Sequence, residues 1–225
     1  MRLVKMVCTL LALASVSLAG LSSSVFGQTA TPPKSSASVH VYLVRGLLNV
    51  FSLGLDSIAE KLRRHGIEAT VHNHMEWLLL ADQAVQACKS GRESEIMVVG
   101  HSLGASAVVE MANRMGEAGV QSSLVVSIDP VVRVVASGHV GRLVNYYVSN
   151  GVGQPVERGA SFHGSLQNID LKNTPDGGHF MTNSDAIQQR VADDVLASVR
   201  SGHVGCRIGA THAAEKPVAV VPPHS

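Results

Sequence analysis

The five residues Gly100-His101-Ser102-Leu103-Gly104 are the part of the sequence whose types and spacing best suit chemistry. They match the pattern Gly-x-Ser-x-Gly, in which the glycines allow a sharp turn that holds a serine hydroxyl out above a sheet. The apolar run 96–99 precedes the turn and predicts a buried strand, and apolar residues at helical spacing follow it over 105–115. Strand, turn and helix in this order make Ser102 the candidate nucleophile.

The candidate base that would activate this serine is His179. A serine hydroxyl is a poor nucleophile until a base takes its proton, and an acid must hold that base in the correct tautomer. His179 stands in Gly177-Gly178-His179-Phe180, between the last predicted strand and the last predicted helix. We therefore expect it at the same edge of the sheet as Ser102, in the chain order serine, acid, histidine.

Three aspartates are candidates for the acid. Asp129 ends the strand that follows the serine turn, and Pro130 stops that strand at once. Asp170 stands at the end of a later predicted strand, and Asp176 lies in Thr174-Pro175-Asp176-Gly177, where turn formation alone explains an aspartate. The sequence favours Asp129 and keeps Asp170 and Asp176 as alternatives.

Two backbone N–H groups are candidates for stabilising an oxyanion. One belongs to Leu103, directly after the serine, and the other should come from the loop after the first strand. That loop begins Arg45-Gly46-Leu47, which points to the N–H of Leu47. The alternative is that Gly46 serves only as a turn residue.

Over residues 39–200 the chain resembles the compact α/β-hydrolases of the lipase, esterase and thioesterase kind. Three segments carry the resemblance: Arg45–Leu47, Gly100–Gly104 and Ile128–Pro130. Gly100 to Gly104 is similar to the lipase nucleophile turn, and Ile128-Asp129-Pro130 resembles the Asp-Pro of pancreatic-type lipases. The resemblance implies a serine hydrolase that cleaves an ester or thioester through an acyl-enzyme on Ser102, with no cofactor and no metal. The chain departs from the pattern at Arg45, where many lipases carry histidine. Most α/β-hydrolases also place the acid one strand later, which keeps Asp170 and Asp176 open.

The predicted elements alternate along the chain and indicate an α/β fold. Alternating strands and helices predict a mostly parallel sheet with helices on both faces, and we expect no separate lid domain. The predicted strands cover 39–44, 68–74, 96–99, 123–128, 143–148 and 166–171. Helices are expected over 55–66, 75–89, 105–116 and 185–200.

The two ends of the chain predict segments that differ from the domain. Residues 1–27 begin with Arg2 and Lys5, continue in an apolar run and then small residues, as a secretory signal peptide does. The polar, Pro/Ser-rich stretch 28–38 predicts a linker, 39–200 the catalytic domain, and 201–225 a flexible tail. We therefore expect a periplasmic or secreted protein, with no stable membrane span after processing.

Composition limits the partners. Without Arg2 and Lys5 the chain carries 16 basic and 17 acidic residues, which gives no reason to expect a nucleic acid partner. A small-molecule or lipid-like acyl substrate is expected instead. Cys88 and Cys206 remain after processing, and the sequence leaves open whether they form a disulfide.

Two other functions are compatible with the same residues. The first is a non-catalytic binding protein on the same fold, because a fold alone does not confer activity. The second is a different reaction of the same three side chains, as in an acyltransferase or an amidase. The sequence specifies neither the acyl length nor the leaving group.

Overall fold

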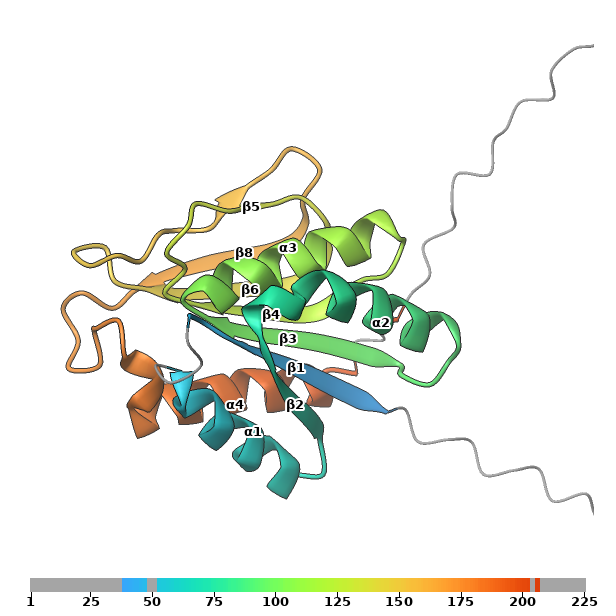
Figure 1. Cartoon of the computed structure of the whole chain (residues 1–225), viewed down its shortest axis with the longest axis horizontal. Helices are drawn as coiled ribbons and strands as arrows, with labels where there is room; N and C mark the ends of the chain where they lie inside the picture. Colours follow the sequence, from blue (N-terminus) through green and yellow to red (C-terminus); the bar gives the residue numbers. More distant parts are fainter. Residues whose placement is uncertain (1–37, 48–51, 203–204, 207–225) are drawn as a thin grey trace, which may run out of the picture. The chain divides into compact units, whose positions relative to one another are not determined.

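The computed structural model describes residues 38–47, 52–202 and 205–206. The predicted signal peptide, the first ten residues of the predicted linker and most of the predicted tail lie outside these residues. The described chain forms a six-stranded sheet in the order β2-β1-β3-β4-β6-β8, and every pair of neighbours is parallel (Figure 1). The prediction of an α/β fold with a parallel sheet is therefore confirmed. The strands are β1 (Val39–Arg45), β2 (Glu68–Asn73), β3 (Glu95–His101), β4 (Ser122–Ile128), β6 (His139–Tyr147) and β8 (His163–Asp170).

Helices cover both faces of this sheet, as Figure 1 shows. One face is covered by α1 (Gly54–Arg64) and α4 (Asp185–Arg200), and the other by α2 (Trp77–Lys89) and α3 (Leu103–Glu117). Successive strand residues point to opposite faces, so Val98 joins the core under α2 and α3, whereas Val99 joins the core under α1 and α4. The continuous apolar runs of the central strands follow from burial on both faces.

Two features of the sheet were not predicted. The short strands β5 (Val135–Ala136) and β7 (Glu157–Arg158) form a second, two-stranded sheet. They are too short to show a sequence period. In addition, β6 and β8 begin earlier than predicted, because their first residues form no continuous apolar run and are held by pairing with their neighbours.

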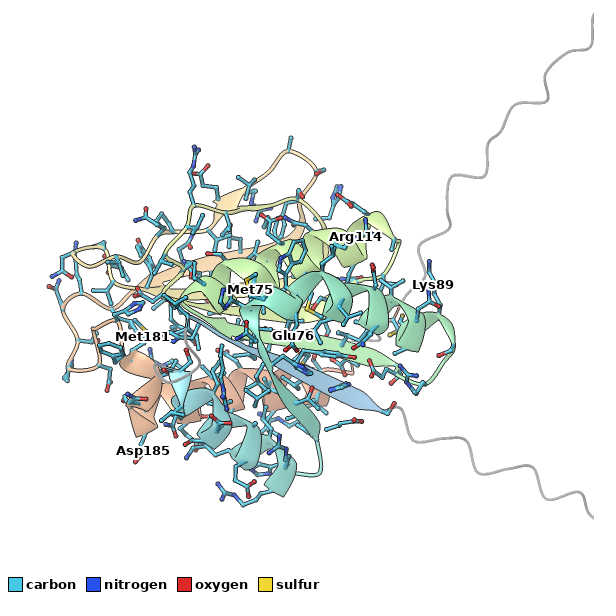
Figure 2. The ribbon with its side chains drawn as sticks, in the orientation of Figure 1. Met75, Glu76, Lys89, Arg114, Met181 and Asp185 are labelled. Atoms are coloured by element: carbon cyan, nitrogen blue, oxygen red, sulfur yellow. The ribbon has the colours of Figure 1, made fainter. Side chains whose placement is uncertain are left out.

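All six strands of the large sheet end at the same edge, on the left in Figure 1, and the segments that follow them meet there. Met181 and Asp185 lie on this side in Figure 2, and Lys89 lies on the opposite side. At that opposite side, the described part of the predicted tail packs against the sheet, because the Cys206 N–H donates to the Ser94 carbonyl. None of the helices in the described ranges is long and apolar enough to cross a membrane.

Candidate active site

Ser102 lies at the point where β3 ends and α3 begins. Its backbone has φ 61° and ψ −121°, a conformation that residues other than glycine rarely adopt. The strain persists because the strand before it and the helix after it fix the turn, and the Ser102 N–H donates to the Ile128 carbonyl of β4 at 2.9 Å. The side chain is thereby held at the carboxyl edge of the sheet.

Close backbone contacts explain the glycines around this serine. A Cβ at Gly100 would lie 2.1 Å from the Gly104 carbonyl oxygen, and a Cβ at Gly104 would lie 2.0 Å from the Val44 carbonyl oxygen. At Gly46 a Cβ would lie 2.9 Å from the Cβ of Ser102. Only glycine lets the loop after β1 come this close to the serine.

Asp129 is the second strained residue of the site. It follows β4 directly and has φ 51°, and among the described residues only Ser102 and Asp129 combine a positive φ with a side chain other than glycine. Its N–H donates to the Tyr146 carbonyl at 2.7 Å, and its Oδ1 accepts from the Val148 N–H at 3.2 Å. These bonds to β6 and the residue after it fix a carboxylate that is almost fully buried.

His179 is the hydrogen-bond partner of this carboxylate. Its Nδ1 lies 2.5 Å from Oδ2 of Asp129. An ionised carboxylate can only accept, so Nδ1 carries the proton and Nε2 of the neutral ring presents its lone pair. The His179 side chain is 31% exposed, against 1% for Asp129, so the ring reaches the surface from a buried anchor.

The other two candidate acids are engaged elsewhere. Asp170 accepts from the N–H and the hydroxyl of Ser149 and from the Lys172 N–H; the Ser149 hydroxyl, above all, lowers the pKa of this carboxyl. Asp176 accepts from the Ser184 hydroxyl just before α4. Of the three aspartates, only Asp129 contacts His179.

One pocket brings the predicted residues together. It has a volume of about 370 Å³ and is open to solvent. Its walls are mostly apolar, and the side chains of Leu47 and Phe180 stand about half exposed at it. The residues that line it are Gly46, Leu47, Ser52, Ser102, Leu103, Val131, His179 and Phe180.

The backbone beside Ser102 offers donors to this pocket. Leu103 is the first residue of α3, so its N–H has no partner within the helix. The Gly46 N–H is bonded to the hydroxyl of Ser52 at 3.1 Å, and Leu47 is the next residue of the same loop. Both predicted oxyanion residues therefore line the pocket that contains the serine.

Two residues at the site were not predicted. Ser52 lines the pocket, and His101 lies fully buried beneath it, with bonds to Ser52 and to the His179 carbonyl. The sequence placed His101 inside the serine turn, which was the one signal that it belongs to the site. Its role could not be predicted because its hydrogen-bond partners stand 49 and 78 residues away in the sequence. Ser52 carries no local pattern that distinguishes it from a turn serine.

No hydrogen bond joins Ser102 to His179 within the described residues. Such bonds are often long or misaligned before substrate arrives and tighten only in the complex. The arrangement has the parts for nucleophilic catalysis: a serine on a strained turn, a histidine anchored by a buried aspartate, and backbone donors beside them.

Comparisons with known proteins bear on the fold. No protein-family model and no curated protein sequence matches the chain. Among solved structures, Est1E from Butyrivibrio proteoclasticus superposes with a TM-score of 0.51 at 10% identity, over 75% of this chain and 91% of that one. This likeness shows a shared fold. A protein from Xanthomonas campestris pv. campestris, described as a putative hydrolase of the alpha/beta superfamily, matches at a TM-score of 0.40 and 13% identity, over 71% of this chain and 98% of that one.

Other reactive groups do not compete with Ser102 in the described structure. Burial raises the pKa of both the Cys88 and the Cys206 thiols, which disfavours the nucleophilic thiolate. The two thiols contact each other at the edge of the sheet opposite Ser102, and they form no disulfide. Over the described residues, no group of three histidine, cysteine or acidic side chains is arranged to hold a metal ion.

Proposed function

We propose that the protein is an exported serine hydrolase that cleaves a carboxylic ester or thioester through an acyl-enzyme on Ser102. The observation that carries the proposal is the Asp129–His179 hydrogen bond beside a serine held at φ 61°. Strained backbone that the surrounding fold maintains is typical of functional sites, and here both strained residues belong to one constellation. The predicted signal peptide supports export.

The proposed first half-reaction forms the acyl-enzyme. The Ser102 Oγ attacks the acyl carbonyl while its proton passes to Nε2 of His179. The carboxylate of Asp129 keeps Nδ1 protonated and stabilises the imidazolium that forms. The N–H groups of Leu47 and Leu103 stabilise the oxyanion of the tetrahedral intermediate.

Collapse of this intermediate completes the first half-reaction, and the second half-reaction then releases the acid. The imidazolium of His179 protonates the leaving alcohol or thiol, and the carbonyl re-forms as the acyl-enzyme. In the second half-reaction, water gives a proton to Nε2 of His179 and attacks the acyl carbon, and Ser102 leaves as its hydroxyl when the proton returns. Each step uses side chains and backbone groups of this chain and requires no cofactor.

The pocket supports an apolar acyl group. Its exposed apolar side chains, Leu47 and Phe180, would lie along an alkyl chain and release water on binding. A volume of about 370 Å³ lies at the lower end of the range for small-molecule sites. We therefore propose that the substrate is a small or medium acyl ester or thioester, free or presented at a lipid surface.

A fluorophosphonate probe tests the proposal directly, because it phosphonylates an activated serine. We expect covalent labelling of the wild type, with the adduct on the peptide that contains Ser102, and no labelling of Ser102→Ala. A series of p-nitrophenyl esters of increasing acyl length then measures the preference of the pocket. An unlabelled wild type that also leaves these esters intact would instead favour the non-catalytic binding protein.

A competing alcohol separates hydrolysis from acyl transfer. In the presence of a few per cent of a short alcohol, a hydrolase releases mainly free acid, whereas an acyltransferase releases mainly the new ester. The corresponding p-nitroanilide tests for an amidase, and we expect it to be hydrolysed far more slowly than the ester. Product analysis by chromatography distinguishes the three outcomes.

A further inference from the structure

His101 is a fully buried histidine whose two ring nitrogens both have partners. It is the last residue of β3 and the immediate neighbour of Ser102. Its Nδ1 lies 2.8 Å from the hydroxyl oxygen of Ser52, and its Nε2 lies 2.7 Å from the carbonyl oxygen of His179. The ring therefore bridges two loops that are remote from each other in sequence.

The partners determine where the ring carries its proton. A carbonyl oxygen only accepts, so Nε2 of His101 must donate to His179. Burial, the largest cause, lowers the pKa of His101 and favours the neutral ring. In the neutral ring Nδ1 then accepts, and the Ser52 hydroxyl must donate to it.

The Ser52 hydroxyl oxygen also accepts a hydrogen bond from the backbone. The Gly46 N–H donates to its Oγ at 3.1 Å. A directional series of hydrogen bonds therefore runs from the Gly46 N–H through the Ser52 hydroxyl and the His101 ring to the His179 carbonyl, and we call it the relay. Every donor in the relay has one acceptor, and reversing any of its hydrogen bonds would leave a polar group without a partner.

The relay ends in the two loops that the proposed reaction needs. Gly46 belongs to the loop after β1, which we call the oxyanion loop, and His179 belongs to the loop before α4, which we call the base loop. Gly46 precedes Leu47 and lies against Ser102, because a Cβ at Gly46 would be 3.2 Å from the Ser102 Oγ. His179 is the proposed base. The ring of His101, held by β3, fixes the distance between these loops on either side of the serine.

We propose that His101 and Ser52 are positioning residues that hold the oxyanion loop and the base loop in register with Ser102. This inference rests on the proposed hydrolase function. Neither residue touches the reacting atoms. Their role is to keep the Leu47 N–H and the His179 ring where the transition state needs them, and small displacements of such groups cost large factors in rate.

The proposal assigns this role to the neutral form of the ring. If His101 were protonated, Nδ1 would donate, and the Ser52 hydroxyl would have to turn away from it. The titratable groups that face the ring are His179, whose ring centroid lies 5.2 Å away, and Asp129 behind His179. A positive charge on His179 during turnover opposes a second charge on His101, so the relay stays neutral while the reaction proceeds.

Ser52→Ala tests the relay with the smallest change. The variant removes one hydroxyl from a buried turn and leaves the serine, the base and the acid in place. On a short-chain p-nitrophenyl ester we expect kcat to fall about 10- to 100-fold with KM within about twofold, because the lost contact positions groups used in the transition state. An alkyl trifluoromethyl ketone, which forms a tetrahedral oxyanion adduct with the serine, should bind more weakly by the same factor.

Ser122→Ala is the matched control. Ser122 is also a fully buried serine whose hydroxyl donates to backbone carbonyls, but it lies at the opposite edge of the sheet, where β4 begins. We expect this variant to keep wild-type kcat and ketone affinity even where its thermal stability falls. A role that is merely structural would reduce activity in both variants in proportion to the stability lost.

His101→Gln gives a second measurement. Glutamine keeps one donor and one acceptor but cannot span both loops, so we expect its kcat to fall at least as far as that of Ser52→Ala. In the double variant the two losses should be markedly less than additive, because one relay is broken once. If His101→Gln fails to fold, the comparison of Ser52→Ala with Ser122→Ala still decides.

The relay is refuted if Ser52→Ala keeps wild-type kcat and ketone affinity, or if Ser122→Ala loses as much of both. Either result would leave the proposed function intact, provided that the wild type hydrolyses the ester and Ser102→Ala does not. An inactive and unlabelled wild type would overturn the proposed function itself. The two failures are therefore distinguishable.

Discussion

His179 and His40 each place a ring nitrogen less than 3 Å from a carboxylate, but of the two only His179 stands beside Ser102. At the carboxyl edge of the sheet, His179 Nδ1 lies 2.5 Å from Asp129. At the amino edge, His40 Nδ1 lies 2.7 Å from Glu93. The contact expected of a catalytic histidine is therefore also made by a histidine remote from Ser102, so the contact alone does not make a site.

The two pairs differ in what surrounds them. His40 is buried, its Nε2 is bonded to the Thr70 hydroxyl at 2.8 Å, and Glu93 also accepts from the Tyr42 hydroxyl. Burial, together with the charge of Glu93, raises the pKa of Tyr42 and keeps it a donor. Every polar atom of that pair has a hydrogen-bond partner, so the pair can stabilise the fold but leaves no ring nitrogen open to a substrate.

His179 presents the opposite arrangement. Its ring lines an open pocket with Ser102, and its Nε2 has no hydrogen-bond partner among the described residues. Catalysis by a histidine–carboxylate pair therefore needs a vacant ring nitrogen, access to solvent and a serine within reach on a strained turn.

Ser102→Ala should have the largest effect. Removing the nucleophile should lower kcat/KM for an activated ester by about 10⁴-fold or more. Steady-state hydrolysis measures the loss, and circular dichroism checks that the fold is kept. Turnover at the wild-type rate in this variant would remove Ser102 from the mechanism.

Asp129→Asn should follow closely. The amide nitrogen or oxygen can still contact Nδ1 of His179, but the ring loses the carboxylate that selects its tautomer and stabilises its cation. We expect kcat to fall by about 10³- to 10⁴-fold. The matched variants Asp170→Asn and Asp176→Asn should stay within about threefold of wild type, and a large loss in either would reassign the acid.

Glu93→Gln should separate stability from activity. The variant weakens the bonds to His40 and Tyr42 inside the fold, which should cost about 1–3 kcal/mol of unfolding free energy. Urea denaturation measures that cost. Because the pair lies at the edge opposite Ser102, kcat and KM should remain within about twofold, and a loss comparable to that of Asp129→Asn would contradict the distinction between the pairs.

The pH dependence of stability should give the smallest effect. Burial lowers the pKa of His101 in the folded state, so between the folded and unfolded values the unfolded chain binds more protons. The stability that this group contributes is therefore lost as pH falls below about 6.5, the ordinary histidine value. Urea denaturation at pH 7.5 and pH 5.5 should show a smaller decrease for His101→Gln than for the wild type, and equal decreases would exclude this assignment.

The sequence predicted the helices and strands well where local patterns suffice. The helix expected over 185–200 is α4, and the apolar runs around Ser102 and before Asp129 are β3 and β4. Period, glycine and proline act over a few residues, so these elements follow from the chain itself. The order of Ser102, Asp129 and His179 along the chain also placed all three at one edge of a parallel sheet.

Only the tertiary structure decided which aspartate meets the histidine. Three aspartates stand between Ser102 and His179, and each follows a strand or a turn. Asp129 contacts His179 because β4 pairs directly with β3 and because its backbone adopts φ 51°. Sheet order and backbone strain arise from packing of the whole domain, and no local pattern encodes them.

The relay through His101 shows the same limit more clearly. The sequence marked His101 only as the variable residue of the serine turn, and it did not mark Ser52 at all. Their roles depend on loops that β1 and β8 bring to one place, 49 and 78 residues from His101. Local residue patterns therefore determined the elements of this protein and marked its proposed nucleophile. The hydrogen-bond partners of the buried polar groups were decided by the fold, since only the fold removes those groups from water and requires that they be paired.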